Sequence, residues 1–299
     1  MLVELDRLGT IAAVARHLHQ TAPGVSMQIS ALEREVGVPL TEKDGRSVRL
    51  TPAGRLLAQH GIEVVERLTL AETQVHALRD GSAGTYRVAA FPSAARTIVA
   101  ATWSDLRAAG GSLRIELTEM EPAESSSALR AGDVDLAITH TYSSLEPMDS
   151  RGLSVRPLCV EPVRLAVPTA RGWSGPVDLH RLAAEDWLVP RRDTGCFAMA
   201  VRACGAAGFA PRVTAEATDF TVLLALVGVG AGVALVPELA VDRLPDGVQL
   251  LTLDQPVDRH LFVATRSSSD ADPGLSRLRA AIARACAAVR GVVPDGPSE

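Results

Sequence analysis

The sequence predicts a chain of three parts: a small helix-rich N-terminal domain, a long linking helix, and an α/β domain of two lobes with parallel-rich sheets. Three observations support this fold class. Apolar residues recur at helical spacing in two short segments before Gly37, a heptad-like seam follows from Leu57, and strand-like and helix-like segments alternate from Tyr86 onward. A length of 299 residues allows two or three domains, each with its own hydrophobic core.

Two short helices joined by a tight turn are expected near the N-terminus. Thr10 can cap the first helix and Thr21 the second, because a threonine hydroxyl accepts from an unpaired N–H of the first turn. Pro23 fits that first turn, and Gly37 is a suitable end. Apolar residues at helical spacing form the inner faces, Ile11, Val14, Ala15 and Leu18 in the first helix and Val25, Ile29, Leu32 and Val36 in the second.

The outer face of the second helix is suited to the major groove of DNA, because its residues are small or polar. Gln28 can form a two-pronged pair with adenine, and Ser26 can contact a base or a phosphate. The candidate DNA contacts of this helix are Thr21, Pro23, Gly24, Ser26, Met27 and Gln28.

A basic hairpin follows the two helices. Its basic residues Lys43, Arg46 and Arg49 outnumber the single acid Asp44, which begins an Asp-Gly turn. Arg46 and Arg49 are expected to bind phosphates or to lie against the minor groove. The helices and hairpin together predict a winged helix-turn-helix over residues 1–52, with a surface helical hairpin carrying scattered arginines as the alternative.

This segment resembles the DNA-binding domain of LysR-type transcriptional regulators. Ala22 stands where the family usually has Gln, and Met27 where it often has Arg, so two polar contacts are absent. The family's first helix also begins several residues earlier, which leaves open that Met1–Leu5 is the second half of a shortened helix. The matching motifs, in order, are Gly9-Thr10-Ile11, Ala12-Ala13, Ala15, Leu18, Pro23, Val25-Ser26, Gln28-Ile29, Leu32-Glu33, Gly37-Val38, Leu40, Gly45-Arg46, Arg49-Leu50-Thr51 and Ala53-Gly54.

A long helix is expected over 53–80, followed by a flexible hinge to Gly84. An apolar seam of a and d type runs along it, interrupted only by Gly61, and needs either a partner or its own domain to pack on. In LysR-type regulators the corresponding helix pairs two chains, so the resemblance implies a two-fold DNA site, a homodimer and a homotetramer that bends DNA. The candidate dimerisation residues are Leu57, Val64, Leu68, Ala71, Val75 and Leu78.

The region 84–291 is expected to form the two lobes, lobe I over about 84–160 and 265–291 and lobe II over about 161–264, before a disordered tail at 292–299. Three segments resemble the LysR-type effector domain, which has the fold of type 2 periplasmic binding proteins: Ala90–Ala95, Leu129–Ile138 and Val229–Pro237. Strands are expected over 86–91, 113–118, 134–138, 163–167, 187–189, 213–217, 233–236 and 261–264, and helices over 94–108, 125–131, 197–207, 220–227 and 275–289.

Polar residues that follow the predicted strands are candidates for an effector site between the lobes. The strand-to-helix turn at Ser93 favours an anionic group. Each Ser or Thr could instead cap a helix, and His140 could be a plain surface histidine. The candidate effector-binding residues are Ser93, Ala94, Ala95, Thr139, His140, Tyr142, Thr194, Thr218 and Asp219.

Composition limits the other classes of function. The net charge of −5 excludes a generally basic nucleic-acid coat, so that DNA contact must be local. We see no signal peptide, and the apolar run 222–236 is too short to span a bilayer, which predicts a cytoplasmic protein without membrane contact. The four cysteines lack metal spacing, so no metal and no cofactor are expected. Cys196 and Cys204 are either a redox pair or inert packing residues.

Together these features predict a transcriptional regulator that binds double-stranded DNA and responds to a small-molecule effector, with RNA polymerase as a further candidate partner. A solute-binding protein of a transport system is the alternative, although it should carry an export signal and no helix-turn-helix. An enzyme is not expected, because no catalytic motif is visible. The glycines at 228, 230 and 232 follow a helix and precede a strand, the reverse of a dinucleotide fingerprint.

Overall fold

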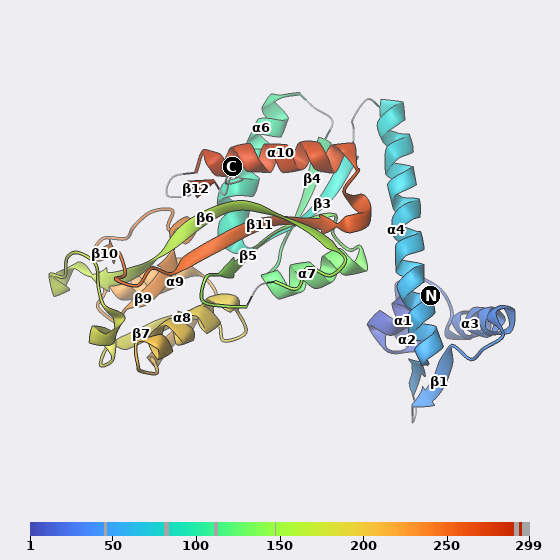
Figure 1. Cartoon of the computed structure of the whole chain (residues 1–299), viewed down its shortest axis with the longest axis horizontal. Coiled ribbons are helices and arrows are strands. Elements are labelled where there is room, and N and C mark those ends of the chain that lie inside the picture. Colours follow the sequence, from blue (N-terminus) through green and yellow to red (C-terminus); the bar gives the residue numbers. More distant parts are fainter. Residues whose placement is uncertain (45–46, 81–83, 111–112, 147, 290–292, 295–299) are drawn as a thin grey trace. The chain divides into compact units, whose positions relative to one another are not determined.

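The computed structural model describes residues 1–44, 47–80, 84–110, 113–146, 148–289 and 293–294 (Figure 1). The chain divides into two compact units, Met1–Val75 and His76–Glu299. The helix α4, Pro52–Asp80, crosses this division. The hinge expected after it falls mainly on residues 81–83, which lie outside the described ones.

The N-terminal unit has the predicted order of short helices, hairpin and long helix. The Thr10 hydroxyl accepts from the N–H of Ala13 and the Thr21 hydroxyl from that of Gly24, both at 3.2 Å, so both predicted caps are confirmed. Gly37 ends the second helix of the motif in a left-handed conformation (φ 77°). The elements before α4 are α1 Leu2–Leu8, α2 Ile11–His17, α3 Ala22–Val36, β1 Thr41–Asp44 and β2 Ser47–Leu50.

The core of this unit joins all of its helices to the hairpin. Val14, Val25 and Leu40 are fully buried in it. Val36, expected on the inner face, is 45% exposed, because it lies in the last turn of α3 beyond that core. That part of the prediction is wrong. The Glu33 carboxylate accepts from the backbone N–H groups of Leu40 and Thr41, both at 2.9 Å, and so holds the hairpin against α3.

Lobe I is built on the sheet order β4-β3-β5-β11-β6. The strands β3 and β4, and β3 and β5, are parallel, whereas β11 pairs antiparallel with both β5 and β6. Helices α6 and α10 cover one face of this sheet and α7 covers the other (Figure 1). The strands are β3 Gly84–Ala90, β4 Leu113–Glu119, β5 Leu136–Tyr142, β6 Leu153–Pro168 and β11 Asp258–Arg266.

The helices of lobe I follow the strands as predicted. One continuous helical stretch follows β3: α5 Pro92–Ala94, a π-helical turn over Ala95–Val99, and α6 Ala100–Ala108. The helix α7, Pro122–Ala131, follows β4. The helix α10, Pro273–Ala287, returns to lobe I near the C-terminal end.

Lobe II continues from the second half of β6. Alternate residues of β6 bury themselves against opposite faces, so that Leu165 packs on the α8 side and Ala166 on the α9 side. The strands β7 and β8 are parallel, and a bridge between Trp187 and Val233 joins β7 to the segment before β9. The elements are β7 Asp186–Pro190, α8 Gly195–Ala206, β8 Arg212–Ala217, α9 Phe220–Gly228, β9 Ala234–Pro237 and β10 Val248–Leu251.

The observed strand pairing corrects the predicted sheets and the predicted limits of the lobes. Parallel pairing is confirmed within each lobe, but β6 pairs antiparallel with β9, β10 and β11, so the connected sheet is mixed. The reason is that β6 leaves lobe I and β11 returns to it in the opposite direction. The predicted limit at 264–265 cuts β11, although β11 pairs with β5 on both sides of that limit.

Three parts of the expected pattern differ. The prediction missed the first half of β6 and the whole of β10. The tail predicted to be disordered over 292–299 includes β12, Val293–Pro294, which pairs with β6, so the prediction is wrong for those two residues. The other residues of that tail lie outside the described ones.

Candidate functional site

The outer face of α3 presents the residues that the sequence predicted. Met27 is 72% exposed, and Pro23 and Gln28 are also exposed, whereas Ser26 is half-buried. Thr21 is exposed as well, but its hydroxyl oxygen already accepts the capping hydrogen bond at the start of α3. The free face of α3 therefore combines one amide side chain with a thioether, and it carries no cation in its first two turns.

The hairpin supplies cationic charge beside this helix. The strands β1 and β2 pair antiparallel, with Glu42 opposite Arg49. The guanidinium Nε of Arg49 lies 2.8 Å from the Glu42 carboxylate, so that its charge is partly balanced at an exposed position. Arg46, the other predicted phosphate contact, lies outside the described residues.

The apolar seam of α4 is largely open to solvent. Val64, Leu68 and Val75 are 58%, 62% and 63% exposed, and Ala71 is exposed as well. Leu57 instead packs against the core of the N-terminal unit. The side chain of Leu78 is not among those described. The described seam residues after Leu57 therefore do not pack on their own domain, although that was the alternative that the sequence left open.

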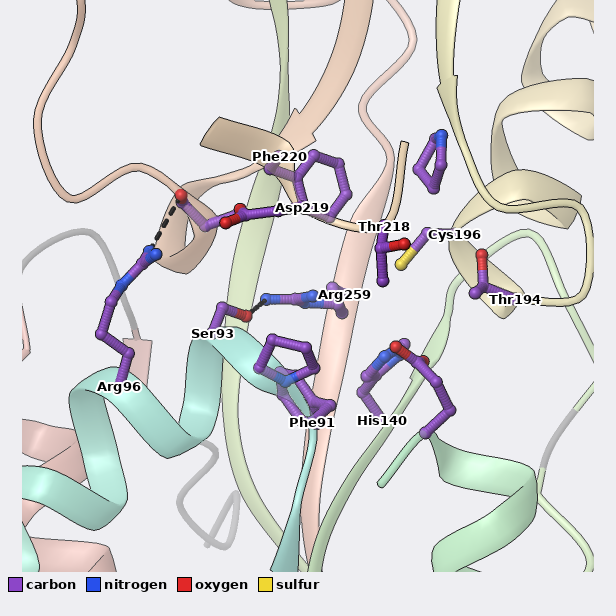
Figure 2. Close-up of a pocket in the computed structure, with 14 residues that line it drawn as sticks. Phe91, Ser93, Arg96, His140, Thr194, Cys196, Thr218, Asp219, Phe220 and Arg259 are labelled. Carbon is purple, nitrogen blue, oxygen red and sulfur yellow. Dashed lines mark hydrogen bonds between the residues drawn. The ribbon is translucent and has the colours of Figure 1, made fainter. Parts of the chain in front are cut away.

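A cavity lies where the two lobes meet (Figure 2). We call it the interlobe cavity. Lobe I contributes residues from the start of α5, from β5 and from β11, and lobe II contributes residues from the starts of α8 and α9. The side chains labelled in Figure 2 are Phe91, Ser93, Arg96, His140, Thr194, Cys196, Thr218, Asp219, Phe220 and Arg259, and Pro92, Glu121, Pro190 and Ala240 complete the lining.

A buried ion pair forms the centre of this region. The guanidinium of Arg259 on β11 donates to the Glu161 carboxylate on β6 at 2.7 Å, and to the Ser93 hydroxyl at 3.0 Å. It also lies 4.8 Å from the centre of the Phe91 ring. Burial alone would lower the pKa of Arg259, but attraction to Glu161 outweighs this and raises the pKa, so that the side chain stays charged.

Glu161 also ties this centre to lobe II. Its second oxygen accepts from the N–H of Leu239, at 2.6 Å, just after β9. Arg96 donates to the carbonyl oxygens of Leu239 and Ala240 at 3.2 and 3.0 Å. The cations of the cavity are therefore already engaged by protein groups.

His140 lies on the wall of the cavity in a neutral form. Its ring contacts Phe91 edge-on at 4.5 Å between centroids and Tyr142 at 5.3 Å. Burial, followed by repulsion from Arg259, lowers the pKa of His140 well below its ordinary value. The alternative of a plain surface histidine is therefore excluded, because only 5% of His140 is exposed.

The structure brings together most of the predicted effector residues. Ser93, His140, Thr194, Thr218 and Asp219 line the interlobe cavity. Ala94, Ala95, Thr139 and Tyr142 do not line it: Ala94 and Ala95 pack into the core of lobe I, Thr139 is 1% exposed, and Tyr142 lines a neighbouring cavity.

Two of the lining residues also cap helices, which for Thr194 is the alternative that the sequence left open. The Thr194 hydroxyl accepts from the N–H of Phe197 at 3.3 Å, and the Asp219 carboxylate from that of Thr221 at 2.8 Å. The sequence reasoning missed Arg96, Glu121, Glu161 and Arg259. A pair such as Glu161 and Arg259, 98 residues apart, leaves no local periodic signal, and the strand containing Arg259 was expected to begin two residues after it.

All four cysteines are buried and free. Cys196 lies 3.0 Å from the Tyr142 hydroxyl, and burial raises the pKa of its thiol. Burial raises the pKa of Cys204 to about 12. The sulfurs of Cys159 and Cys286 lie 2.6 Å apart in the core of lobe I, a contact that the sequence did not predict. A low thiol pKa marks reactive cysteines, so these surroundings favour inert packing for Cys196 and Cys204.

No described helix is long and apolar enough to cross a membrane. Within the same residues, no cluster of His, Cys, Asp and Glu side chains is arranged to hold a metal ion.

Comparison with known proteins gives matches over nearly the whole chain. Residues 1–55 match the family model described as bacterial regulatory helix-turn-helix protein, lysR family, and residues 79–287 match that of the LysR substrate binding domain. The HTH-type transcriptional regulator TfdS of Cupriavidus pinatubonensis is 34% identical over 77% of this chain and 77% of its own length. The HTH-type transcriptional regulator ClcR of Pseudomonas putida is 30% identical over 80% of this chain and 81% of its own length.

Solved structures show the same fold. A full-length OxyR variant from Pseudomonas aeruginosa superposes with a TM-score of 0.71 and 22% identity, covering 99% of this chain and 96% of that one. Full-length CbnR in complex with its target DNA superposes with a TM-score of 0.57 and 23% sequence identity. This match covers 95% of the present chain and 97% of the CbnR chain. The chain belongs to the LysR family of bacterial helix-turn-helix proteins, and it is a DNA-binding transcriptional regulator with an effector domain rather than a transport binding protein.

Proposed function

We propose that this regulator binds DNA as a pair of chains, joined along α4, and that an effector in the interlobe cavity controls the pair. The exposed apolar seam at Val64, Leu68 and Val75 is the observation that supports pairing of two chains along α4. A row of exposed aliphatic side chains at heptad spacing is stabilised when a second helix covers it. The homotetramer implied by the family resemblance stays a prediction.

Pairing matters because one α3 offers few contacts. Each copy would insert Gln28 and Ser26 into the major groove, with Pro23, Gly24 and Met27 against the groove wall and Arg49 at the backbone. The exposure of Met27 and Gln28 supports this placement. Two copies read two half-sites, about 34 Å or one helical turn apart, and the second contact raises the affinity of the first.

The effector acts through the two lobes. The lining of the cavity comes from both, so a ligand there binds more tightly to one lobe arrangement than to another. It can shift the equilibrium only by that difference in affinity. The protein would work in the cytoplasm, where DNA and RNA polymerase are available, and RNA polymerase is the further partner that transcription regulation supports.

The pairing is tested with Leu68→Glu in the full chain. A charge in the seam should lower the mass measured by analytical ultracentrifugation and weaken binding to a two-half-site DNA by at least about tenfold, or 1.4 kcal/mol. Thr69→Glu, which adds the same charge one position along the exposed surface of α4, is the control. An unchanged mass and DNA affinity for Leu68→Glu would contradict the pairing.

A further inference from the structure

A second cavity adjoins the interlobe cavity. We call it the side cavity. It has a volume of about 360 Å³, against about 40 Å³ for the interlobe cavity. Glu121, His140 and Thr194 line both cavities and form the wall between them. A ligand that reaches this wall therefore has most of its space in the side cavity.

Two polar atoms of the wall lack a partner. Among the described residues, Glu121 Oε2 and His140 Nδ1 are buried and accept or donate no hydrogen bond. The third wall residue differs, because Thr194 Oγ1 donates to the carbonyl of Arg191 at 2.7 Å. His140 is 95% buried, so bulk water does not compensate for the missing bond. An unsatisfied buried polar group is costly, and a bound ligand, ion or water can supply the missing hydrogen bond.

The side cavity is acidic. Its charged lining residues are Glu121, Glu146, Asp149 and Asp193 against Arg130. Asp149 and Asp193 form ion pairs with neighbouring arginines, but no ion pair of Glu121 or Glu146 occurs among the described residues. Burial raises the pKa of Glu121, and a cation placed beside it would favour the charged carboxylate.

The interlobe side offers little for an anion. Arg259 is balanced by Glu161, and the Ser93 hydroxyl already accepts from Arg259. The helical stretch that begins at Pro92 runs through the π-helical turn into α6, so the N–H groups of its first turn are the feature on this side that favours an anion. The anionic group favoured by the sequence at Ser93 stays a prediction, which the carboxylate probes below test.

We propose that the effector is a small organic amine whose protonated amino group binds at Glu121 and His140, with the rest of the molecule in the side cavity. An ammonium group has three donors, so it has one for Glu121 Oε2 and another for His140 Nδ1 in the tautomer that leaves this nitrogen unprotonated. A hydroxyl has one donor and serves only one of them. The proposal rests on the proposed function, because it takes these joined cavities as the effector site.

The test is a thermal-shift series on the full chain at pH 7. The probes are benzylamine and butylamine, with benzyl alcohol and butanol as neutral isosteres and benzoate and butyrate as anionic ones. We expect at least one amine to raise the melting temperature by about 2 °C at about 10 mM, with no shift from its alcohol or carboxylate. Carboxylates that raise it while amines do not, or an absence of any amine shift, would overturn the proposal.

Two variants locate the effect. Glu121→Gln keeps the shape of the side chain and should abolish the amine shift, whereas Glu124→Gln, on an exposed position of α7, should keep it. An amine shift that survives Glu121→Gln would also count against the proposal. Binding of the unaltered chain to its upstream DNA is measured in parallel. Sequence-specific binding without any amine shift in the unaltered chain refutes the ligand class alone, and a lack of sequence preference refutes the DNA-binding mode.

Discussion

The proposed DNA-reading surface and the interlobe cavity are built in opposite ways. The first comes from one stretch, Thr21 to Arg49, whose residues are held by near neighbours such as the Glu33 bonds to Leu40 and Thr41. The second joins distant segments, and its central contact, between Glu161 and Arg259, spans 98 residues. Contacts on the DNA surface can therefore change without loss of the fold, whereas the charged groups of the cavity also hold the two lobes together.

The largest loss of stability is expected at Glu161, which lies at the centre of the cavity region and also connects the two lobes. Glu161→Ala leaves the Arg259 charge buried and unpaired, and should lower the free energy of unfolding of the effector domain by about 3–5 kcal/mol. Denaturant unfolding of the full chain measures this. The control is Arg212→Ala, which breaks the exposed pair with Asp186 and should cost no more than about 1 kcal/mol. Equal losses for the two variants would show that the buried pair does not hold the lobes.

A smaller effect is expected in the N-terminal unit, where backbone packing is the constraint. A Cβ on Gly54 would overlap the carbonyl group of Leu40, so Gly54→Ala should destabilise this unit by about 1–3 kcal/mol. A Cβ on Gly61 would lie 3.3 Å from a methyl of Val3, which can adjust. Gly61→Ala should therefore be neutral or gain up to about 1 kcal/mol of helix propensity. Unfolding monitored by circular dichroism compares the two, and equal behaviour would contradict the packing difference.

The smallest effect concerns the pH dependence of the effector domain. The pKa of His140 is lowered in the folded state, whereas an unfolded histidine titrates near about 6.5. As the pH falls below about 6.5, the unfolded state binds a proton that the folded state does not, so stability is lost on acidification. His140→Gln should reduce this loss by about 1 kcal/mol per pH unit between about pH 6.5 and 5.5.

The control for the pH experiment is another histidine. His60 on α4 has a 63% exposed side chain, and His60→Gln should leave the pH dependence of unfolding close to that of the unaltered chain. The same slope in His140→Gln as in the unaltered chain would mean that burial of a neutral His140 does not cause the loss of stability on acidification.

The DNA-reading surface could be predicted from the sequence more fully than the interlobe cavity, because its interactions are local. The caps at Thr10 and Thr21 and the end at Gly37 were predictable, because each acts within one helical turn. The antiparallel return of β11 was not, since apolar runs in parallel and antiparallel strands of a buried sheet look alike. The polar residues after strand ends identified five of the fourteen residues that line the cavity. Glu121 carries the same signal, because it follows the end of β4, whereas Arg259 has no local pattern and depends on the tertiary fold.

The most direct test compares two DNA-surface variants in the full chain. Binding to the chain's upstream DNA and to a shuffled sequence is measured by fluorescence anisotropy over a range of salt concentrations. The account predicts a clear preference for the upstream DNA, which Gln28→Ala reduces by about 1–3 kcal/mol, whereas Arg49→Ala weakens both sequences alike and lowers the salt slope by about 1. Arg202→Ala, at an exposed position of α8, should change neither quantity. Equal affinity of the unaltered chain for both sequences, or a Gln28→Ala variant with full preference, would contradict the proposed reading of DNA by α3.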